Sequence, residues 1–583
     1  MYTRCIRMLA VASVAAACTS PRATPGADRA DYDLVIAGGH VVDGTGNPWF
    51  AGDVGIRGDR IVRVGPAGSL AQANAKRRID AAGLVVAPGF IDIQGQSDSA
   101  FLLGDGRNVS KVTQGITTEI LGEGATPAPA NARTLAIDAS SDTTMARVDT
   151  AWRGTHGFGR WLDAMERHGM SENVGSFVGA ATIRVYGKAA DTGAATPAQL
   201  DTMRAAVSRA MADGAFGLAS ALIYPPGGYA STDELIAEAK AMAPYHGVYI
   251  THMRSEGDHL LDGLAEAMRI GREGGVPVEI YHLKAAGPRN WPAMARVIAM
   301  IDSARAAGQD VGADMYAYEA GATALAACLP PWSAAGDSLL QRVADPASRA
   351  RIRIDLLNPH TAWESLCQLA TPQGVMVVGL KDPADKSYEG LRLAEIATRE
   401  HKAWPDALMD VVAREKAQVG AEFFIAGEKN LELQMRQPWL KFGTDADGSD
   451  PDSLKGQLGH PRAYGNYPRI LGRYVREQHV LTIEDAIRKM TSAVAERLSI
   501  PERGLLREGY YADVVVFDPT TIIDNATYEK PSLISTGVHE VFVNGVEVVR
   551  DEKHTGAKPG RVVRGPGALM DASGRLASGP GAG

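Results

Sequence analysis

The feature that most limits how this chain can fold is the alternation of strand-like and helix-like segments through its middle. Short apolar runs end in polar residues, and helical patterns such as residues 197–213 and 260–274 follow them. This order predicts parallel strands joined by helical crossovers. Eight strands are expected, at residues 88–94, 116–122, 174–181, 214–221, 247–252, 277–282, 310–316 and 440–445. Eight such units predict an α/β fold, a closed (β/α)8 barrel of the TIM type, with reactive residues at the carboxyl ends of its strands.

Two β-rich segments flank the expected barrel, which spans residues 87–504. Residues 28–86 and 505–583 alternate apolar residues with Gly-Gly, Asp-Gly and Asn-Gly turns. We therefore expect both ends of the chain to build one small β-sandwich domain. The interval between the last two barrel strands is too long for one crossover, so residues 320–375 are expected to form an inserted lid. A helix at 482–498 is expected to close the barrel.

The first 27 residues are expected to be a targeting segment and no part of the fold. Arg4 and Arg7 precede an apolar run at residues 8–17, which is too short to cross a bilayer. The sequence Ala-Ala-Ala-Cys at 15–18 resembles a bacterial lipoprotein cleavage site. We expect an exported protein, periplasmic or held at the outer membrane through a lipidated Cys18; periplasmic export without a lipid is the alternative.

The overall composition is ordinary for a globular protein, with 45% hydrophobic and 22% charged residues. A net charge of -8 over 583 residues argues against a nucleic-acid-binding surface. The four cysteines follow no spacing pattern. Cys328 and Cys367 could pair, but we expect isolated buried thiols.

Polar residues stand at the ends of four expected strands: Glu123, His252, His282 and Asp445. Each alone has a structural explanation, such as a carboxylate in a glycine-rich turn or a packed histidine. Together, two imidazoles and a carboxylate form a three-ligand site with one open position, which is how catalytic zinc is held. A metal there lowers the pKa of water and polarises a substrate carbonyl. Asp445 is then the expected general base, passing a proton from water to the leaving nitrogen.

Two cationic side chains follow the histidines on the same side of the extended chain. These are Lys284 and Arg254. Either could bind a substrate carboxylate, and an arginine does so with two parallel hydrogen bonds. The alternative for both is a structural ion pair, for which Glu256 is a ready partner of Arg254. Tyr316, on the seventh strand, is expected to line the pocket, with core packing as the alternative.

Several segments match one family: APGFID (87–92), ALIYPPGGYAS (221–231), ITHMRSEG (250–257), YHLKAAG (281–287), FGTDADG (442–448) and HPRAYGNYPRILGRYVRE (460–477). Through them the chain resembles the D-aminoacylases (N-acyl-D-amino-acid deacylases) of the amidohydrolase superfamily, from about residue 32 to residue 565. The resemblance implies a (β/α)8 barrel with a small β-domain, zinc, and hydrolysis of the amide bond of an N-acyl amino acid.

The resemblance also implies roles for single residues. The two metal histidines, the catalytic aspartate, the lysine that binds the substrate carboxylate and a tyrosine near it match His252, His282, Asp445, Lys284 and Tyr316. Glu123 stands where the best-known members have a cysteine ligand. The serine that the family places shortly after the tyrosine is Ala322 here, a departure within the carboxylate pocket.

A larger departure lies at the end of the first strand. The superfamily usually has His-x-His there, two ligands of a second metal, whereas this chain has Gln94 and Gln96. Because zinc prefers imidazole, thiolate and carboxylate ligands, glutamine is a poor substitute. We therefore expect one zinc ion per chain, and expect the two glutamines to hydrogen-bond the water or the substrate acyl oxygen.

These observations favour a zinc-dependent hydrolase that acts on N-acyl amino acids, with D-amino acids implied by the family, or on related small amides. One alternative is a hydrolase of cyclic amides or lactones, since attack by water serves any carbonyl. Another is a non-catalytic envelope protein that binds a ligand in a degenerate site. Asp445 argues for the enzyme, because a mere binding protein has little use for it.

Overall fold

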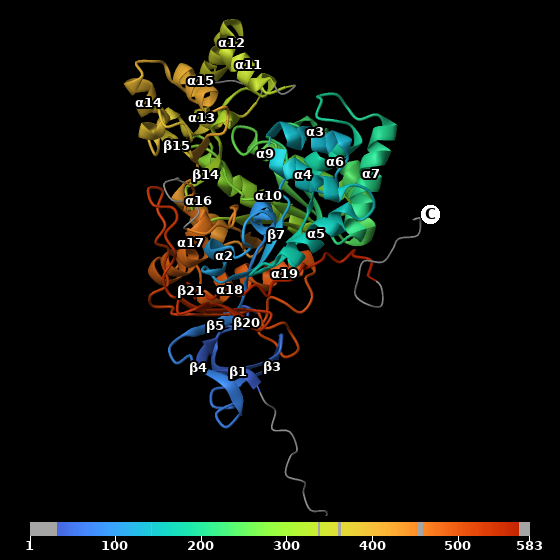
Figure 1. The fold of residues 1–583 in the computed structure, drawn as a ribbon. Helices are drawn as coiled ribbons and strands as arrows, with labels where there is room; N and C mark the ends of the chain where they lie inside the picture. Colours follow the sequence, from blue (N-terminus) through green and yellow to red (C-terminus); the bar gives the residue numbers. More distant parts are fainter. Residues whose placement is uncertain (1–31, 142, 336–337, 359–362, 452–458, 571–583) are drawn as a thin grey trace, which may run out of the picture.

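The computed structural model describes residues 32–570 except 142, 336–337, 359–362 and 452–458, and it is a mixed α/β structure (Figure 1). The expected targeting segment, including Cys18, lies outside the described residues. Within the described part of the chain, no helix is both long and apolar enough to cross a membrane.

The centre of the molecule is built from parallel strands in two sheets. One has the order β6-β7-β8 and the other β17-β13-β12-β11-β10-β9. Their bounds are β6 (Phe90–Asp92), β7 (Ile116–Leu121), β8 (Asn173–Ser176), β9 (Val178–Gly179), β10 (Gly217–Ala221), β11 (Val248–His252), β12 (Val278–Ile280), β13 (Val311–Met315) and β17 (Leu440–Phe442). Beyond the ends of β6 and β17, the amide of Asp445 donates to the carbonyl of Gln94 at 2.8 Å. This contact brings the first and last parallel strands together.

Helices follow the parallel strands and cover them. The main ones are α5 (Gly157–His168), α6 (Ala180–Gly187), α7 (Pro197–Ala212), α8 (Thr232–Met242), α9 (Leu260–Gly274), α10 (Met294–Ala306) and α16 (Glu428–Met435). Thr196 and Gln199 form a capping box at the start of α7, which satisfies free backbone amides there. The strands read as continuous apolar runs because both of their faces are buried. The expected helix at 482–498 is two helices, α18 (Ile483–Met490) and α19 (Ser492–Leu498).

Five further helices belong to the same part of the chain. They are α1 (Asp98–Leu102), α2 (Val109–Val112), α3 (Ala132–Ser141), α4 (Thr143–Asp149) and α17 (Arg462–Arg469). A π-helical segment continues α17 over Ile470–Glu477.

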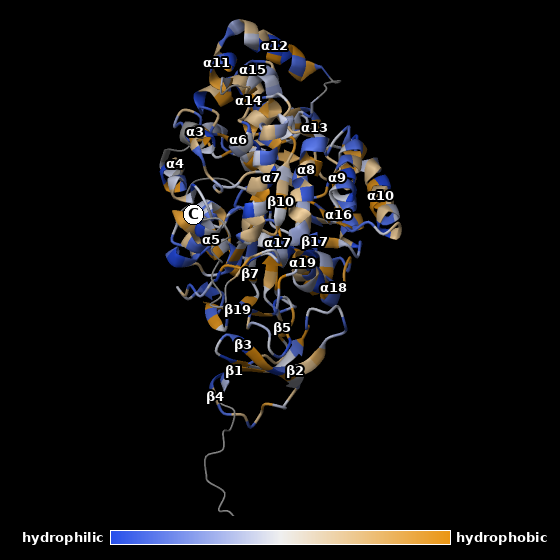
Figure 2. Ribbon diagram, turned by 90° about the vertical axis from the view of Figure 1, so that its right-hand side faces the viewer, coloured by the Kyte–Doolittle hydropathy of each residue, from blue (hydrophilic) through white to orange (hydrophobic). Residues whose placement is uncertain are grey.

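Strands from both ends of the chain form one nine-stranded sheet at the opposite end of the molecule from the insert (Figure 1). They are β1 (Tyr32–Val41), β2 (Phe50–Arg57), β3 (Arg60–Pro66), β4 (Ala75–Asp80), β5 (Val85–Pro88), β18 (Val514–Phe517), β19 (Val538–Val543), β20 (Val546–Arg550) and β21 (Lys553–His554). Antiparallel pairing of β5 with β18 joins the two halves. Strands of this sheet are largely orange in Figure 2, because their inner face forms a separate hydrophobic cluster.

An inserted unit separates β13 from β17 and stands at the top of Figure 1. Its antiparallel sheet has the order β14 (Ala320–Ala324), β16 (Gly420–Phe424), β15 (Val375–Val378). Around it lie α11 (Leu339–Ala344), α12 (Pro346–Leu357), α13 (Leu366–Ala370), α14 (Leu393–Arg399) and α15 (Trp404–Arg414). The unit extends beyond residue 375, the limit expected from the sequence, because its middle strand is β16.

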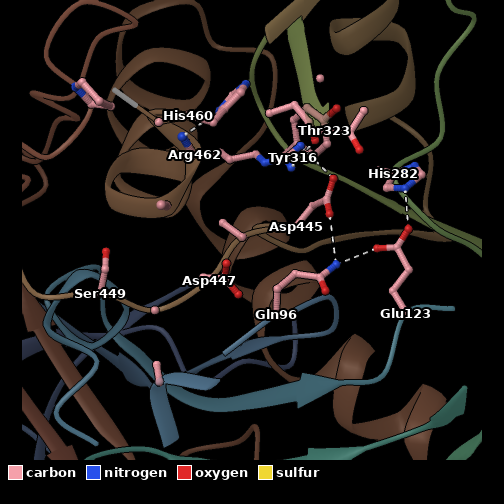
Figure 3. A pocket seen from close by; sticks show the side chains of 18 of the residues that line it. Gln96, Glu123, His282, Tyr316, Thr323, Asp445, Asp447, Ser449, His460 and Arg462 are labelled. Atoms are coloured by element: carbon pink, nitrogen blue, oxygen red, sulfur yellow. Dashed lines mark hydrogen bonds and ion pairs between the residues drawn. The ribbon is translucent and has the colours of Figure 1, made fainter. Parts of the chain in front are cut away.

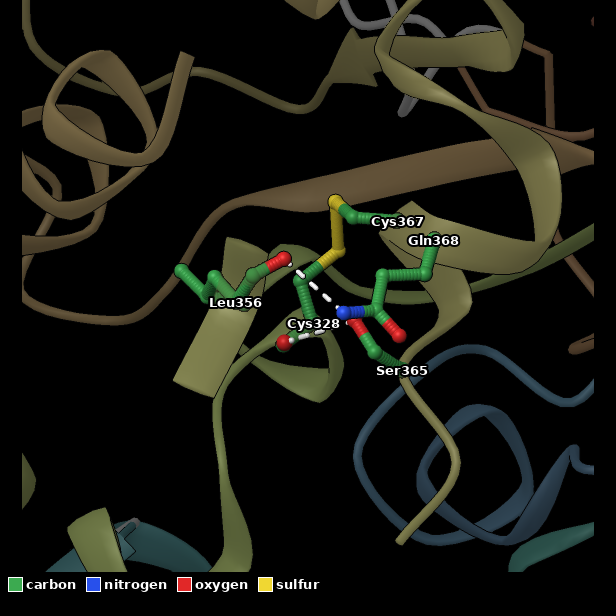
Figure 4. Close-up of a disulfide and its surroundings, with 5 residues drawn as sticks. All are labelled: Cys328, Leu356, Ser365, Cys367 and Gln368. Atoms are coloured by element: carbon green, nitrogen blue, oxygen red, sulfur yellow. Dashed lines mark hydrogen bonds between the residues drawn. A yellow bond between two sulfur atoms is a disulfide. The ribbon is translucent and has the colours of Figure 1, made fainter. Parts of the chain in front are cut away.

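A disulfide bond joins Cys328 to Cys367 inside this unit (Figure 4). The expectation of isolated thiols was therefore wrong. The two residues are 39 positions apart in sequence, and packing of α13 against the segment 325–328 brings their Cα atoms to 5.1 Å. The Ser365 hydroxyl donates to the carbonyl of Cys328 at 3.1 Å and holds the same junction.

Candidate active site

Glu123, His252 and His282 converge at the carboxyl ends of three parallel strands. Oε1 of Glu123 lies 3.1 Å from Nε2 of His282 and 3.4 Å from Nδ1 of His252. One ligand atom from each residue lies within 4.8 Å of the other two. All three side chains are at most 9% exposed. The structure thus brings together the three residues that the sequence singled out as metal ligands. Figure 3 shows two of them, Glu123 and His282.

Local backbone geometry aims these side chains into the site. Gly122 and Gly124 adopt positive φ on either side of Glu123, and a Cβ on Gly122 would lie 2.4 Å from the carbonyl oxygen of Phe177. Only glycine fits there. His282 and Asp445 have φ of 32° and 51°, left-handed values that are uncommon for residues other than glycine and that gather at functional sites.

The charges around the cluster favour a cation between these residues. Burial alone would raise the pKa of Glu123, but His282 and His252 outweigh it and hold that pKa well below its usual range. Burial and Lys284 lower the pKa of His282, yet Glu256 and Glu123 raise it well above its ordinary value. An environment that stabilises an imidazolium also stabilises a metal cation. Two imidazoles and one carboxylate are a donor set that suits zinc, so the residues present fit the implied ion.

Asp445 lies across the site from the histidines and is paired with a residue that the sequence analysis missed. Nη1 of Arg462, at the start of α17, lies 2.7 Å from Oδ2 of Asp445. Burial raises the pKa of Asp445, and Arg462 partly offsets this effect. The guanidinium also lies 4.6 Å from the ring centre of Tyr316. Arg462 belongs to the HPRAYG segment, so the signal was present in the sequence without an assigned role.

Gln94 and Gln96 both point at Glu123. Their amide nitrogens donate to Oε2 of Glu123 at 2.6 and 2.8 Å, and Gln96 also lies 3.4 Å from Oδ1 of Asp445. Gln96 lines the cavity, whereas Gln94 is buried behind it. The amides were expected to meet the water or the substrate; in this structure they hold the carboxylate ligand.

Lys284 is buried against the cluster, where its ammonium lies 2.8 and 3.0 Å from the two carboxylate oxygens of Glu256. It lines the cavity. Arg254 does not: it pairs with Glu266 on α9 at 2.9 Å and donates to two backbone carbonyls. The structure therefore gives Arg254 a structural ion pair in place of the expected substrate contact. Its partner is Glu266, because Glu256 is taken by Lys284.

A cavity of about 1220 Å³ opens onto these groups. One wall comes from the inserted unit, which contributes Ala322, Thr323, Phe423 and Ile425. Tyr224 and Tyr316 line it near the histidines. The Tyr224 ring centre lies 5.5 Å from that of His252, and the Tyr316 ring centre lies 6.4 Å from that of His282. A cavity of this size takes a small molecule, with its polar groups gathered at one end.

Comparison with known proteins identifies relatives of this chain. A model of the amidohydrolase family matches residues 429–549. The D-aminoacylase of Alcaligenes xylosoxydans xylosoxydans is 34% identical over 540 residues, which cover 92% of this chain and 98% of that protein. This chain belongs to the D-aminoacylase family of amidohydrolases. That finding confirms the resemblance inferred from the sequence motifs.

Solved structures of this family agree with the fold. A structure of D-aminoacylase, solved to study one-metal activation and second-metal attenuation at its binuclear centre, superposes with a TM-score of 0.75. It is 32% identical and covers 91% of this chain and 100% of that chain. The structure of N-acyl-D-glutamate deacylase from Bordetella bronchiseptica, complexed with zinc and a phosphonate mimic of the tetrahedral intermediate, superposes with a TM-score of 0.73. The sequences are 30% identical, and the match covers 92% of this chain and 100% of that chain.

Proposed function

We propose that this member of the family is a zinc-dependent deacylase of N-acyl-D-amino acids. The observation that carries the proposal is the convergence of Glu123, His252 and His282 opposite Asp445 on one deep cavity. Three relatives that match over nearly the whole chain are named D-aminoacylase, N-acyl-D-glutamate deacylase and N-acyl-D-aspartate deacylase. The fold that goes with it is a closed (β/α)8 barrel, with the inserted unit as a lid over the cavity.

The chemistry divides between the ion and the chain's own groups. Zinc held by Glu123, His252 and His282 would supply Lewis-acid activation of water and of the amide carbonyl. Asp445 takes the proton from the attacking water and delivers it to the leaving nitrogen. Its raised pKa suits both steps, because a carboxylate that is too weak a base would not accept the proton. Arg462 opposes this rise of the pKa and holds Asp445 in place through an ion pair at 2.7 Å.

The substrate carboxylate would lie against the cationic wall of the cavity. Arg462 and Lys284 both line it, and Tyr316 lies between them, with Lys284 5.7 Å from its ring centre. Both cations already have an anionic partner, Lys284 in Glu256 and Arg462 in Asp445, so both are candidates for the contact with the substrate.

We propose one zinc ion per chain, because Gln94 and Gln96 replace two histidines with hydrogen-bond donors. Their amides engage Oε2 of Glu123 and leave Oε1 for the ion between the histidines. A carboxylate oxygen that accepts two short hydrogen bonds is a poor ligand for a second cation.

We also propose that the protein is exported, with Cys18 as a lipid-bearing residue. The Cys328–Cys367 disulfide favours this location, because such bonds form and persist in oxidising compartments. Labelling of cells with a radioactive fatty acid tests the lipid: wild-type protein should incorporate label and a Cys18→Ala variant should not.

Activity is tested by incubating purified protein with N-acetyl-D- and N-acetyl-L-amino acids and measuring the free amine. The proposal predicts zinc-dependent release from D-substrates and its loss in Asp445→Asn. Asp447→Asn is the matched control, since Asp447 also lines the cavity but makes no contact with the histidines. A protein that binds zinc and N-acyl amino acids without releasing amine would instead be the non-catalytic binding protein.

A further inference from the structure

We propose that Glu256 is a positioning residue that holds both metal histidines from behind, and that a carboxylate of the inserted unit, Glu364, fixes Glu256 in turn. The inference rests on the proposed function in that it concerns the same zinc site. The sequence suggested only that Glu256 could pair with Arg254, and none of the motifs assigned it a role at the metal.

Glu256 faces the ring nitrogens of both histidines that turn away from Glu123. Its Oε1 lies 3.0 Å from Nδ1 of His282, whose Nε2 faces Glu123. Its Oε2 lies 3.8 Å from Nε2 of His252, whose Nδ1 faces Glu123. The Glu256 side chain is only 3% exposed, so water competes little for these contacts. One buried carboxylate thus lies beside both imidazoles, at hydrogen-bonding distance from His282 and at ion-pair distance from His252.

This geometry has a definite consequence for metal binding. A histidine that donates its second N–H to a carboxylate is fixed in tautomer and ring orientation, and its free nitrogen becomes a better donor to a metal. Oε1 of Glu256 lies 3.0 Å from Nδ1 of His282, and the Lys284 ammonium lies 2.7 Å from the same nitrogen. When Nε2 of His282 binds the ion, the neutral ring carries its proton on Nδ1, and Oε1 of Glu256 is the acceptor within reach, since an ammonium only donates. Nε2 of His252 is buried and has no hydrogen-bond partner among the described residues, and Oε2 of Glu256 lies 3.8 Å from it.

The positive charge of Lys284 gives Glu256 a second role. Its ammonium lies 2.7 Å from Nδ1 of His282 and is held by both oxygens of Glu256. Without Glu256, a buried positive charge would face the histidines with no anion behind it, and it would repel a metal cation. Glu256 therefore supplies orientation for the ligands and neutralises the lysine at the same time.

The inserted unit holds the turn that carries Glu256. Glu364 accepts hydrogen bonds from the amides of Glu256 and Gly257, at 3.1 and 2.9 Å, and from the hydroxyl of Ser255 at 2.5 Å. Glu364 precedes α13, the helix that the disulfide anchors through Cys367. The insert thereby reaches the back of the metal site through one carboxylate, a connection that does not require any movement of a lid.

The test is a zinc titration of metal-free protein against a chromophoric chelator, for wild type, Glu256→Ala and Glu256→Gln. We expect the zinc dissociation constant to rise about 10- to 100-fold in Glu256→Ala. Glu256→Gln should lose less, because its amide oxygen still accepts from Nδ1 of His282. The visible absorption spectrum of the cobalt(II) form should change in Glu256→Ala, since the imidazoles are no longer fixed. Glu266→Gln, which alters the partner of Arg254, should bind zinc as wild type does.

Equal zinc affinities in wild type, Glu256→Gln and Glu256→Ala would overturn the positioning role. If Glu256→Ala does not fold, the comparison of Glu256→Gln with Glu266→Gln decides. A wild-type protein that binds zinc and shows the Glu256 effect, yet releases no amine from N-acyl amino acids, would overturn the proposed function and leave this inference standing. A wild type without zinc affinity would overturn both.

Discussion

Gln94 donates a hydrogen bond of 2.6 Å from its side-chain amide to Oε2 of Glu123. Gln96 adds a second donor at 2.8 Å to the same oxygen. The superfamily usually has metal-binding histidines at these two positions. Here both side chains hold the carboxylate of Glu123, the residue that we propose as a zinc ligand.

Restoring histidines at these positions should create a second metal site. The double variant Gln94→His, Gln96→His places two imidazoles beside Oε2 of Glu123, which then has no amide donors and can bind a cation. Metal analysis after dialysis in zinc should rise from about one to about two ions per chain. If the double variant still holds a single ion, the glutamines are not what limits the wild type.

Substitutions of Glu123 should separate ligand chemistry from hydrogen bonding. Glu123→Ala should abolish stoichiometric zinc binding, because two histidines alone are too few protein ligands for zinc. Glu123→Cys should keep zinc, since a thiolate is a ligand that zinc accepts and the well-known members of the family have a cysteine at this position. Isothermal titration with zinc gives the affinity of each variant. Full zinc affinity in Glu123→Ala would remove Glu123 from the ligand set.

Stability should depend on pH through Glu422 on β16. This side chain is fully buried, and neither of its oxygens has a hydrogen-bond partner within the described residues. Burial raises its pKa from 4.5 to about 8, against the opposing effects of Arg462 and Arg392. Between these two pH values the folded chain binds a proton that the unfolded chain has lost. The free energy of unfolding therefore falls as pH rises through this window.

The Glu422→Gln variant should remove this pH dependence, because a neutral amide has no charge to bury. Melting temperatures at pH 6 and pH 8 should differ less in the variant than in wild type, with the gain at pH 8. Glu496→Gln, on the exposed side of α19, is the control and should leave the difference between the two pH values unchanged. The account would be contradicted if the melting temperature changed between pH 6 and pH 8 by the same amount in wild type, Glu422→Gln and Glu496→Gln.

Loss of the disulfide should destabilise the inserted unit. Cys328→Ser opens a cross-link that closes a loop of 39 residues, and bonds of this kind contribute about 2–4 kcal/mol. Urea unfolding of the variant and of reduced wild type should show the same loss. Identical unfolding curves with and without reductant would mean that the bond contributes nothing to stability in solution.

The sequence was most informative for residues whose position is fixed by the end of a single strand. His252 and His282 end neighbouring parallel strands, so the alternation of strands and helices was enough to predict that they lie side by side. The glycines on either side of Glu123 predicted a tight turn at the same edge of the sheet. The pairing of long side chains could not be predicted in this way. Glu256 was the expected partner of Arg254, but the structure pairs Arg254 with Glu266 on α9 and Glu256 with Lys284.

Contacts made by the insert and by α17 also escaped prediction, because they depend on how distant segments pack. Arg462 stood in a quoted motif, but its position over Asp445 follows from the docking of α17 at the cavity. The strand Gly420–Phe424 was not among the strands expected from the sequence, and the insert was expected to end at residue 375. Its antiparallel partners lie far away in sequence, so it lengthened the insert beyond the expected limit.

The central claim is that the protein hydrolyses N-acyl-D-amino acids with one zinc ion and Asp445. The most direct measurement is the metal content of purified wild type and Asp445→Asn, paired with amine release from N-acetyl-D-amino acids by the same samples. The account predicts about one zinc per chain in both proteins and a rate about 10²- to 10⁴-fold lower in the variant. A metal-free wild type, or an Asp445→Asn variant as active as wild type, would contradict it.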